Sequence, residues 1–198
     1  MPDLPERFKY EEELAAALLL AWEESKQDVA QCVEPDWDQL QAEIERQTEE
    51  TLAATAIAAA LLMMFDLSGT QRLPVGFGAD TGQAKGLADG LVKTRRDAWA
   101  EGIDPEAYND RWFSDYAAES IGITETTGAI SLGEALLQAE LLAAGVEVVA
   151  VWRIDPRSNV CPICQELNGQ EETHWVKDFP NGPPAHVNCR CFKTYHPI

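Results

Sequence analysis

Apolar residues recur every three or four positions through most of the first 145 residues, which is the spacing of one buried face on an α-helix. Leu14, Leu18 and Trp22 are the first residues to show it. The helices that this spacing predicts cover residues 8–31, 37 to 65 or 67, 83–101, 105–116 and 132–144. The front of the chain is therefore expected to be a helical body.

Residues that favour helix ends set the boundaries of these elements. Asp36 and Asp104 each precede a predicted helix as N-caps, and Pro105 suits the first helical position. The second helix is long, so we expect it to be bent or broken around Thr48–Thr51. Glycines and prolines crowd residues 68–82, which predicts an irregular connection and the most mobile segment.

The pattern changes after Gly145, which stops the last helix. Residues 146–154 alternate and are rich in β-branched side chains, so they predict a strand of about eight residues. Loops follow, with a tight turn expected at Asn168-Gly169. The fold class is therefore α+β, with an acidic helical region in residues 1–110 and a second region in 111–198 that ends, from about residue 146, in a small β-rich module.

The formal net charge of −19 is concentrated in the helical part. Residues 1–50 carry 15 acidic and 4 basic side chains, residues 51–150 carry 14 and 6, and residues 151–198 carry 5 and 5. Because affinity for nucleic acids comes largely from lysine and arginine on phosphates, general nucleic-acid binding is not expected. The charge serves solubility, or steers the body toward a basic protein partner.

The most apolar segment, residues 52–67, contains Thr55 and Asp66 and is too short to cross a bilayer comfortably. A buried helix is expected there, and its alanine-rich stripe would allow close packing within the chain or between chains of an oligomer. The first residues lack the basic and apolar regions of a secretory signal. We therefore expect a reducing cytosol, where clustered cysteines favour metal over disulfides.

Two clusters near the end of the chain have the spacing of a zinc site. Cys161-Pro-Ile-Cys164 places two thiolates on one side of a tight loop, and His186-Val-Asn-Cys189 repeats the spacing with an imidazole and a thiolate. The segment has too few apolar residues for a core of its own, so a metal staple is expected. The sequence thus predicts one structural Zn²⁺ per chain.

Cys191 is a fifth candidate ligand, because on an extended strand it would face the same side as Cys189. Either cysteine could be the fourth ligand, or both could bind with His186 left outside. We favour Cys161, Cys164, His186 and Cys189 as the four ligands and leave Cys191 open. The remaining histidines, His174 and His196, are interpreted as surface residues, and Cys32 as a small buried hydrophobic residue at a helix end. Trp152, Trp175 and Phe179 are expected to form a small core beside the ligands.

Other chemistry is less favoured. A thioredoxin-type redox pair would need a helix immediately after the motif, whereas residues 165–169 are expected to turn. A catalytic zinc would need an open coordination position and a carboxylate base. Asp155 and Glu166 are near in sequence, but four protein ligands leave no room for water. We therefore expect no enzymatic activity.

The order of motifs from residue 115 to 195 resembles the Mu F-like minor head proteins, the head morphogenesis proteins of tailed bacteriophages and prophages. The motifs that carry the resemblance are Ile123-Thr-Glu-Thr, a helix to Gly145, a strand ending in Trp152, Asp155, Cys161-Pro-Ile-Cys164, Leu167-Asn-Gly169-Gln, and Pro183-Pro-Ala-His186-Val-Asn-Cys189-Arg-Cys191. Family members usually have proline after the histidine, where this chain has Val187.

The resemblance implies that residues 111–198 form a head morphogenesis domain with a structural role. It implies a low-copy protein of the procapsid interior that contacts portal or capsid proteins, resides in the host cytoplasm during assembly and then in the virion head, and acts in head assembly or DNA delivery. Within this domain, Thr124 and Thr127 are expected to cap a helix and Glu125 to lie in its first turn. Arg190 is expected to donate to a ligand sulfur or to Asp155 and so to orient the site.

Two other classes remain open. An HNH-type nuclease on a zinc-knuckle scaffold would use a histidine–asparagine pair, for which His186 and Asn188 are a weak match. A host adaptor whose zinc module binds a protein partner would have much the same sequence.

Overall fold

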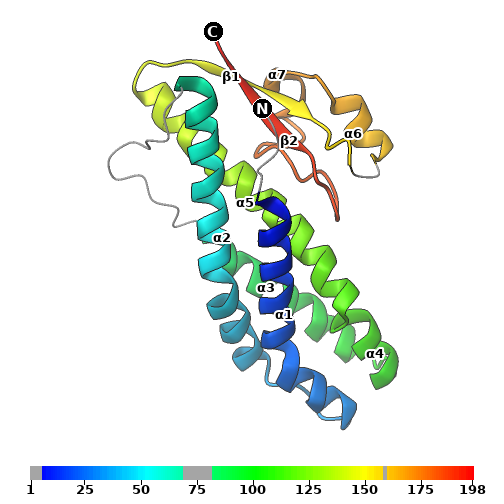
Figure 1. The fold of residues 1–198 in the computed structure, drawn as a ribbon. Helices are drawn as coiled ribbons and strands as arrows, with labels where there is room; N and C mark the ends of the chain where they lie inside the picture. The colour runs from blue at the N-terminus through cyan, green and yellow to red at the C-terminus, as the bar shows by residue number, and fades with distance from the viewer. Residues whose placement is uncertain (1–5, 69–81, 158–159) are drawn as a thin grey trace.

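The computed structural model describes residues 6–68, 82–157 and 160–198. Its elements, in chain order, are α1 (Arg7–Ala30), α2 (Trp37–Ser68), α3 (Gln83–Ala100), α4 (Pro105–Trp112), α5 (Asp115–Ala143), β1 (Val148–Arg153), α6 (Pro162–Leu167), α7 (Glu172–Trp175) and β2 (Phe192–Pro197). Helices α1, α2, α3 and α5 form an elongated bundle with α4 at one end, and the two strands with α6 and α7 lie at the other end (Figure 1). The predicted α+β class is confirmed.

The predicted N-caps of α2 and α4 are confirmed. Asp36 Oδ1 accepts a hydrogen bond from Gln39 N at 3.0 Å, and Asp104 Oδ2 accepts one from Ala107 N at 3.2 Å. Both carboxylates satisfy an amide that has no partner inside the helix. Helix α3 also keeps its expected range to within one residue.

The predicted break in the second helix is wrong, because α2 is continuous through Thr48–Thr51. The hydroxyl of Thr48 donates to Ile44 O at 2.8 Å, and that of Thr55 donates to Thr51 O at 2.7 Å. A threonine hydroxyl that bonds one turn back in this way can be buried inside a helix without interrupting it.

The predicted end of the fourth helix and the predicted start of the fifth are also wrong. Helix α4 ends at Trp112, and Ser114 Oγ caps α5 by accepting from Ala117 N at 3.2 Å. Helix α5 then runs unbroken for 29 residues, through the region where a new helix start was expected. Thr124 and Thr127 therefore lie inside α5 and cap nothing, and Glu125 lies near its middle instead of in its first turn.

Cys32 is exposed, which corrects the expectation of a buried residue. It follows α1 with φ of +59°, and this left-handed backbone turns the chain out of the helix. A residue at such a helix end points into solvent instead of continuing the buried face of the helix.

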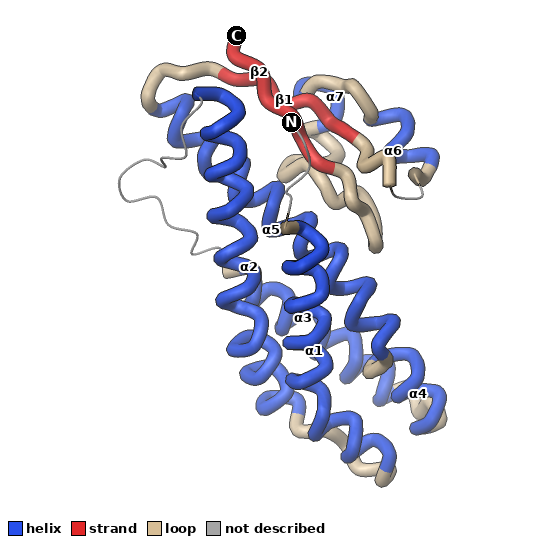
Figure 2. Tube along the Cα trace, viewed as in Figure 1, coloured by secondary structure: helices blue, strands red, loops and turns tan. Residues whose placement is uncertain are grey.

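The sheet has two antiparallel strands, with Val148 opposite Pro197 and Trp152 opposite Lys193 (Figure 2). The first strand has six residues instead of about eight. The turn at Asn168-Gly169 is confirmed: Gly169 has φ of +84°, and Gln170 N donates to Leu167 O at 2.9 Å. This turn is fixed to β1, because Gly169 N donates to Trp152 O at 2.8 Å.

A second apolar cluster joins the sheet to the bundle. Trp152 packs edge-on against Trp175, with ring centroids 5.5 Å apart, and Phe179 lies 5.5 Å from Trp152 on centroids. Met63 of α2 and Leu137 of α5 belong to the same cluster, as do three of the candidate metal ligands. The expected small core beside the ligands is therefore confirmed, and the ends of two bundle helices complete it.

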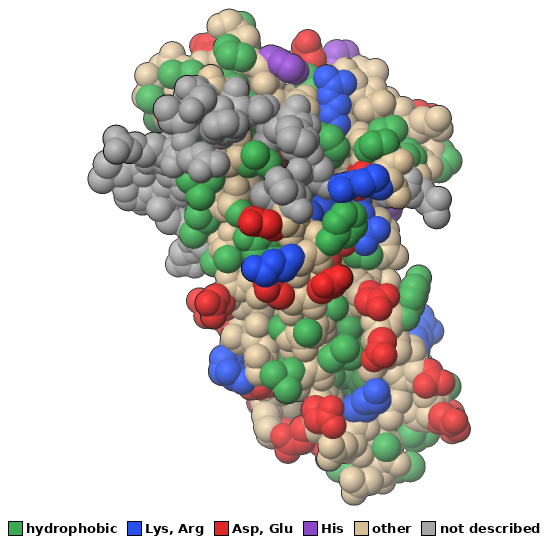
Figure 3. Space-filling model, viewed as in Figure 1, with side chains coloured by type: hydrophobic (Ala, Val, Ile, Leu, Met, Phe, Trp, Pro, Cys, Tyr) green, Lys and Arg blue, Asp and Glu red, His purple; other side chains and the backbone are tan. Residues whose placement is uncertain are grey.

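The predicted boundary between two regions of the chain at residue 110 stays a prediction. Helix α5, which follows this boundary, packs against both α1 and α2, which precede it. The irregular connection expected at 68–82 lies almost wholly outside the described residues. Among the residues that are described, no helix is both long and apolar enough to cross a membrane. On the face drawn in Figure 3, acidic side chains are spread over the helical bundle.

Candidate metal centre

All five predicted ligand side chains come together at the end of the bundle. They form two sets of three that share Cys164, one with Cys161 and His186, the other with Cys189 and Cys191. Within each set the donor atoms lie within 4.8 Å of one another. His174 and His196 are exposed and belong to neither set, as predicted.

The distances around Cys164 are those of a compact metal site. Its Sγ lies 3.2 Å from His186 Nε2 and 3.8 Å from Cys189 Sγ. Two sulfurs bound tetrahedrally to zinc at about 2.3 Å are about 3.8 Å apart. All five ligand residues line one small void of about 10 Å³, together with Val160, Asn188 and Arg190.

The first pair of ligands is held by a short helix. Cys161 is the N-cap of α6, its Sγ accepts from Cys164 N at 3.3 Å, and Pro162 occupies the first helical position. This corrects the expectation that the chain turns directly after the motif, because α6 continues to Leu167 before turning. The helix has only six residues, so the motif is a tight knuckle on a single short element.

The imidazole of His186 is oriented by its own loop. Its Nδ1 lies 2.7 Å from the Val187 carbonyl oxygen, so Nδ1 carries the proton and donates. Nε2 is then unprotonated in the neutral ring and faces Cys164 Sγ. A histidine ligand whose second nitrogen donates to a carbonyl is the usual arrangement around bound metals.

The thiols of this cluster perturb one another. The hydrogen bond from Cys191 lowers the pKa of Cys189 strongly despite its burial. Burial, together with the adjacent Cys189 thiolate, raises the pKa of Cys164. Burial opposes the shift at Cys161, but hydrogen bonds from Cys164 lower the pKa of its thiol. Burial also opposes the shift at His186, but its hydrogen bond to Val187 and the nearby thiolates raise the pKa of the imidazole. The lowered pKa values favour negative charge on the sulfurs of Cys189 and Cys161, whereas the thiol of Cys164 stays neutral unless a bound cation displaces its proton.

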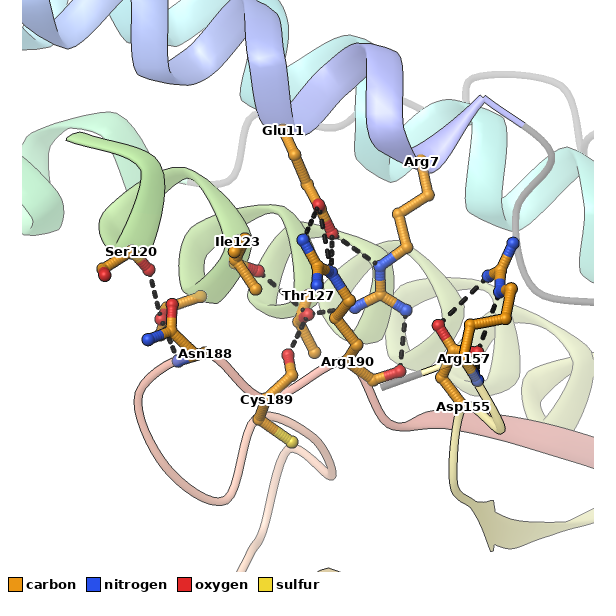
Figure 4. A network of polar contacts seen from close by, with 11 residues as sticks. Arg7, Glu11, Ser120, Ile123, Thr127, Asp155, Arg157, Asn188, Cys189 and Arg190 are labelled. Carbon is orange, nitrogen blue, oxygen red and sulfur yellow. Dashed lines mark hydrogen bonds and ion pairs between the residues drawn. The ribbon is translucent and has the colours of Figure 1, made fainter. Parts of the chain in front are cut away.

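The loop that carries the second pair of ligands is fixed by side chains of the bundle. Asn188 N donates to Thr124 Oγ1 at 3.0 Å, and Thr127 Oγ1 lies 2.5 Å from the Cys189 carbonyl oxygen (Figure 4). Arg7 Nη1 donates to the Arg190 carbonyl at 2.9 Å. The two threonines that were expected to cap a helix thus bind the loop instead.

A charge network in which Arg7 and Glu11 are buried and Arg190 is partly exposed surrounds these contacts. Glu11 accepts from Arg7 Nε at 3.0 Å and from Arg190 Nη2 at 2.7 Å (Figure 4). The side chain of Arg190 therefore bonds to Glu11, not to a ligand sulfur or to Asp155 as expected. Asp155 is bound by the backbone and guanidinium of Arg157, and these bonds lower its pKa although burial opposes the shift.

Sequence reasoning missed Arg7 and Glu11, which lie more than 170 positions before Arg190. Their only local signal is an arginine and a glutamate one helical turn apart, which is common on exposed helix faces. Comparison of the chain with known protein families, with curated proteins and with solved structures finds no match.

Proposed function

We propose that the cluster is a structural zinc site with one Zn²⁺ per chain, held by Cys161, Cys164, His186 and Cys189. The observation that carries this proposal is that two compact sets of three sulfur and imidazole donors share Cys164, so that Cys161 and His186 lie on one side of its thiol and Cys189 and Cys191 belong to the other set. Cys191 is then the neighbour whose thiol hydrogen-bonds to Cys189. The Cys191→Ser variant described below tests whether Cys189 or Cys191 is the fourth ligand.

A structural role is favoured over a catalytic one. Four protein ligands complete the tetrahedron and leave no position for a reactive water. Of the two carboxylates nearest to the first motif in sequence, Asp155 is bound by Arg157 and Glu166 is exposed on α6. The metal would instead fasten α6 and the loop before β2 to each other and to the bundle.

At the level of biology, we propose a phage minor head protein of the Mu F-like kind. The motifs in residues 115–195 support this reading, and the acidic bundle suits a protein that shares a procapsid with packaged DNA without binding it. Portal or capsid proteins would be its partners, first in the host cytoplasm and then inside the head.

The zinc proposal is tested by elemental analysis of the full chain purified in reducing buffer without chelator. About one zinc per chain is expected for the wild type, lost in Cys161→Ser and kept in Cys32→Ser, whose thiol is remote and exposed. Retention in Cys191→Ser would support the favoured ligand set. Absence of metal from the reduced wild type would overturn the proposal.

The biological proposal is tested by deleting the gene from the phage or prophage that carries it. We expect heads that are fewer, or that deliver no DNA, with rescue by the wild type and not by Cys161→Ser. The zinc-loaded protein should neither retain duplex DNA at physiological salt nor cleave it when Mg²⁺ is added. Cleavage would favour the HNH-type nuclease, and normal heads from the deletion would overturn the phage role.

A further inference from the structure

We infer that the first turn of α1 belongs functionally to the metal centre, with Arg7 and Thr127 as positioning residues for the loop that carries His186 and Cys189. Metal affinity then depends on how α1 is docked, although α1 supplies no ligand. This inference rests on the proposed metal site and adds the regulation of that site by the bundle.

The loop depends on outside contacts. Between α7 and β2, residues 176–191 contain no helix and no strand. Within this stretch Asn188, Cys189 and Arg190 each have a backbone group bonded by a side chain of the bundle. Because the three residues are consecutive, these bonds fix the path of the backbone on both sides of the Cys189 thiol.

Thr127 is the central contact. Its oxygen lies 2.5 Å from Cys189 O and 3.0 Å from Ile123 O, and it also accepts a hydrogen bond from Arg7 Nη2. A hydroxyl has one hydrogen and two lone pairs. Since the guanidinium occupies a lone pair, the single hydrogen is directed to the side of the two carbonyls, of which Cys189 O is the closer. Arg7 thereby orients the group that anchors Cys189.

The same arginine closes a second link. Arg7 and Glu11 are 0 % and 6 % exposed, and Glu11 binds the Arg190 side chain while Arg7 binds its carbonyl. The residue between Cys189 and Cys191 is therefore held at both its backbone and its guanidinium by one face of α1. Neighbours that orient ligands in this way change metal affinity when they are removed.

Thr127→Val tests the inference, because valine keeps the shape of threonine and removes only the hydroxyl. Thr126→Val is the matched control: Thr126 is equally buried on α5, and its hydroxyl has no hydrogen-bond partner among the described residues. Zn²⁺ dissociation constants are measured on the full chain by competition with a chromophoric chelator, and the visible spectrum of the Co²⁺-substituted protein reports ligand geometry.

We expect Thr127→Val to bind Zn²⁺ about tenfold more weakly and to alter the Co²⁺ spectrum. Thr126→Val and the hydroxyl-restoring Thr127→Ser should match the wild type. If Thr127→Val bound Zn²⁺ as tightly as the wild type, or if Thr126→Val weakened binding as much as Thr127→Val, the inference would be overturned and the proposed zinc site would not be affected. A wild type that binds no metal would overturn both. Far-UV circular dichroism of each variant shows that the bundle is folded.

Discussion

At the scale of single residues, the end of α1 is closed by an unusual amino acid. Cys32 N donates to Val29 O and Val33 N donates to Asp28 O, both at 2.9 Å, which is the pair of bonds that closes a Schellman motif. The residue between them must take a left-handed backbone, and Cys32 has φ of +59°. Glycine is the residue that takes this conformation without steric cost.

Cys32→Gly should therefore raise the free energy of unfolding by about 0.5–1 kcal/mol. Urea unfolding followed by circular dichroism measures the change. Cys32→Ala is the control, because alanine keeps the Cβ and should give no gain. A glycine variant that is no more stable than the alanine variant would show that the strain at this residue is negligible.

The imidazole of His186 makes metal binding sensitive to pH. Hydrogen bonding to Val187 and the nearby thiolates raise its pKa in spite of burial, so the ring is protonated at a higher pH than an ordinary histidine. A protonated imidazole cannot bind metal. The cysteine ligands make zinc affinity fall on acidification in any case, and from a pH above about 6.5 downward the fall should become steeper because His186 then takes up a proton as well.

This pH dependence is measured by chelator competition at constant ionic strength. His174→Gln provides the control, since His174 is exposed and outside both sets of ligands. The control should titrate as the wild type does. A pH dependence that does not steepen between pH about 8 and pH about 5 would show that His186 is not a ligand.

At the scale of elements, the alanine-rich stripe of α2 is used within the chain. A Cβ added at Gly133 of α5 would lie 2.0 Å from the carbonyl oxygen of Ala56, so the two helix backbones are in direct contact. Ala56, Ala59 and Ala60 are all buried. The small side chains of the stripe let α5 approach α2 closely. This close packing fixes the position of α5, whose Thr124 and Thr127 contact the ligand loop.

Gly133→Ala should be strongly destabilising, by about 3 kcal/mol or more, because backbone and not a flexible side chain opposes the new methyl group. Gly90→Ala is its control. Gly90 lies inside α3 with no atom within 4 Å of the added Cβ, so alanine there should stabilise the helix by about 0.5–1 kcal/mol. Thermal unfolding of both variants gives the comparison, and similar melting temperatures would contradict the tight crossing.

The elements that could be predicted from the sequence are those with a local signal. Asp36 and Asp104 bond to amides three residues on, so their roles could be read from sequence alone. Thr124 and Thr127 resemble caps locally, yet their hydroxyls bond back within α5 and across to a loop that follows 60 residues later. Polarity alone does not distinguish a helix start from a contact between distant segments.

The same limit holds for the site. Cys161 and Cys164, and His186 and Cys189, were found because each pair is close in sequence and has ligand spacing. Arg7 was not, because its contact to Arg190 spans 183 positions and an arginine near the chain start has many uses. Folding brings the first described turn of the bundle onto the last loop of the chain.

At the scale of the whole molecule, the contact between Arg7 and Arg190 should make the two ends of the bundle differ in how strongly they depend on metal. The first turn of α1 lies beside the ligand loop, while α4 lies at the opposite end (Figure 1). Coupling between two sites is reciprocal, so if docking of α1 supports metal binding, metal must stabilise the docking of α1. The effect should fade along the bundle with distance from the loop.

Removing the metal with a chelator should accordingly speed amide hydrogen exchange in residues 161–191 and in the first turn of α1, including Tyr10, whose N–H donates to Glu6 O. Exchange in α4 should not change, which makes the far end of the bundle an internal control. Mass spectrometry of peptides from the same sample compares all three regions at once. In Thr127→Val, the response of α1 should shrink while that of the ligand loop persists, because the link to α1 is weakened and the ligands remain. If α1 exchanged at the same rate with and without metal while the loop opened, the module would be an independent appendage, and the Arg7–Glu11–Arg190 network would serve stability alone.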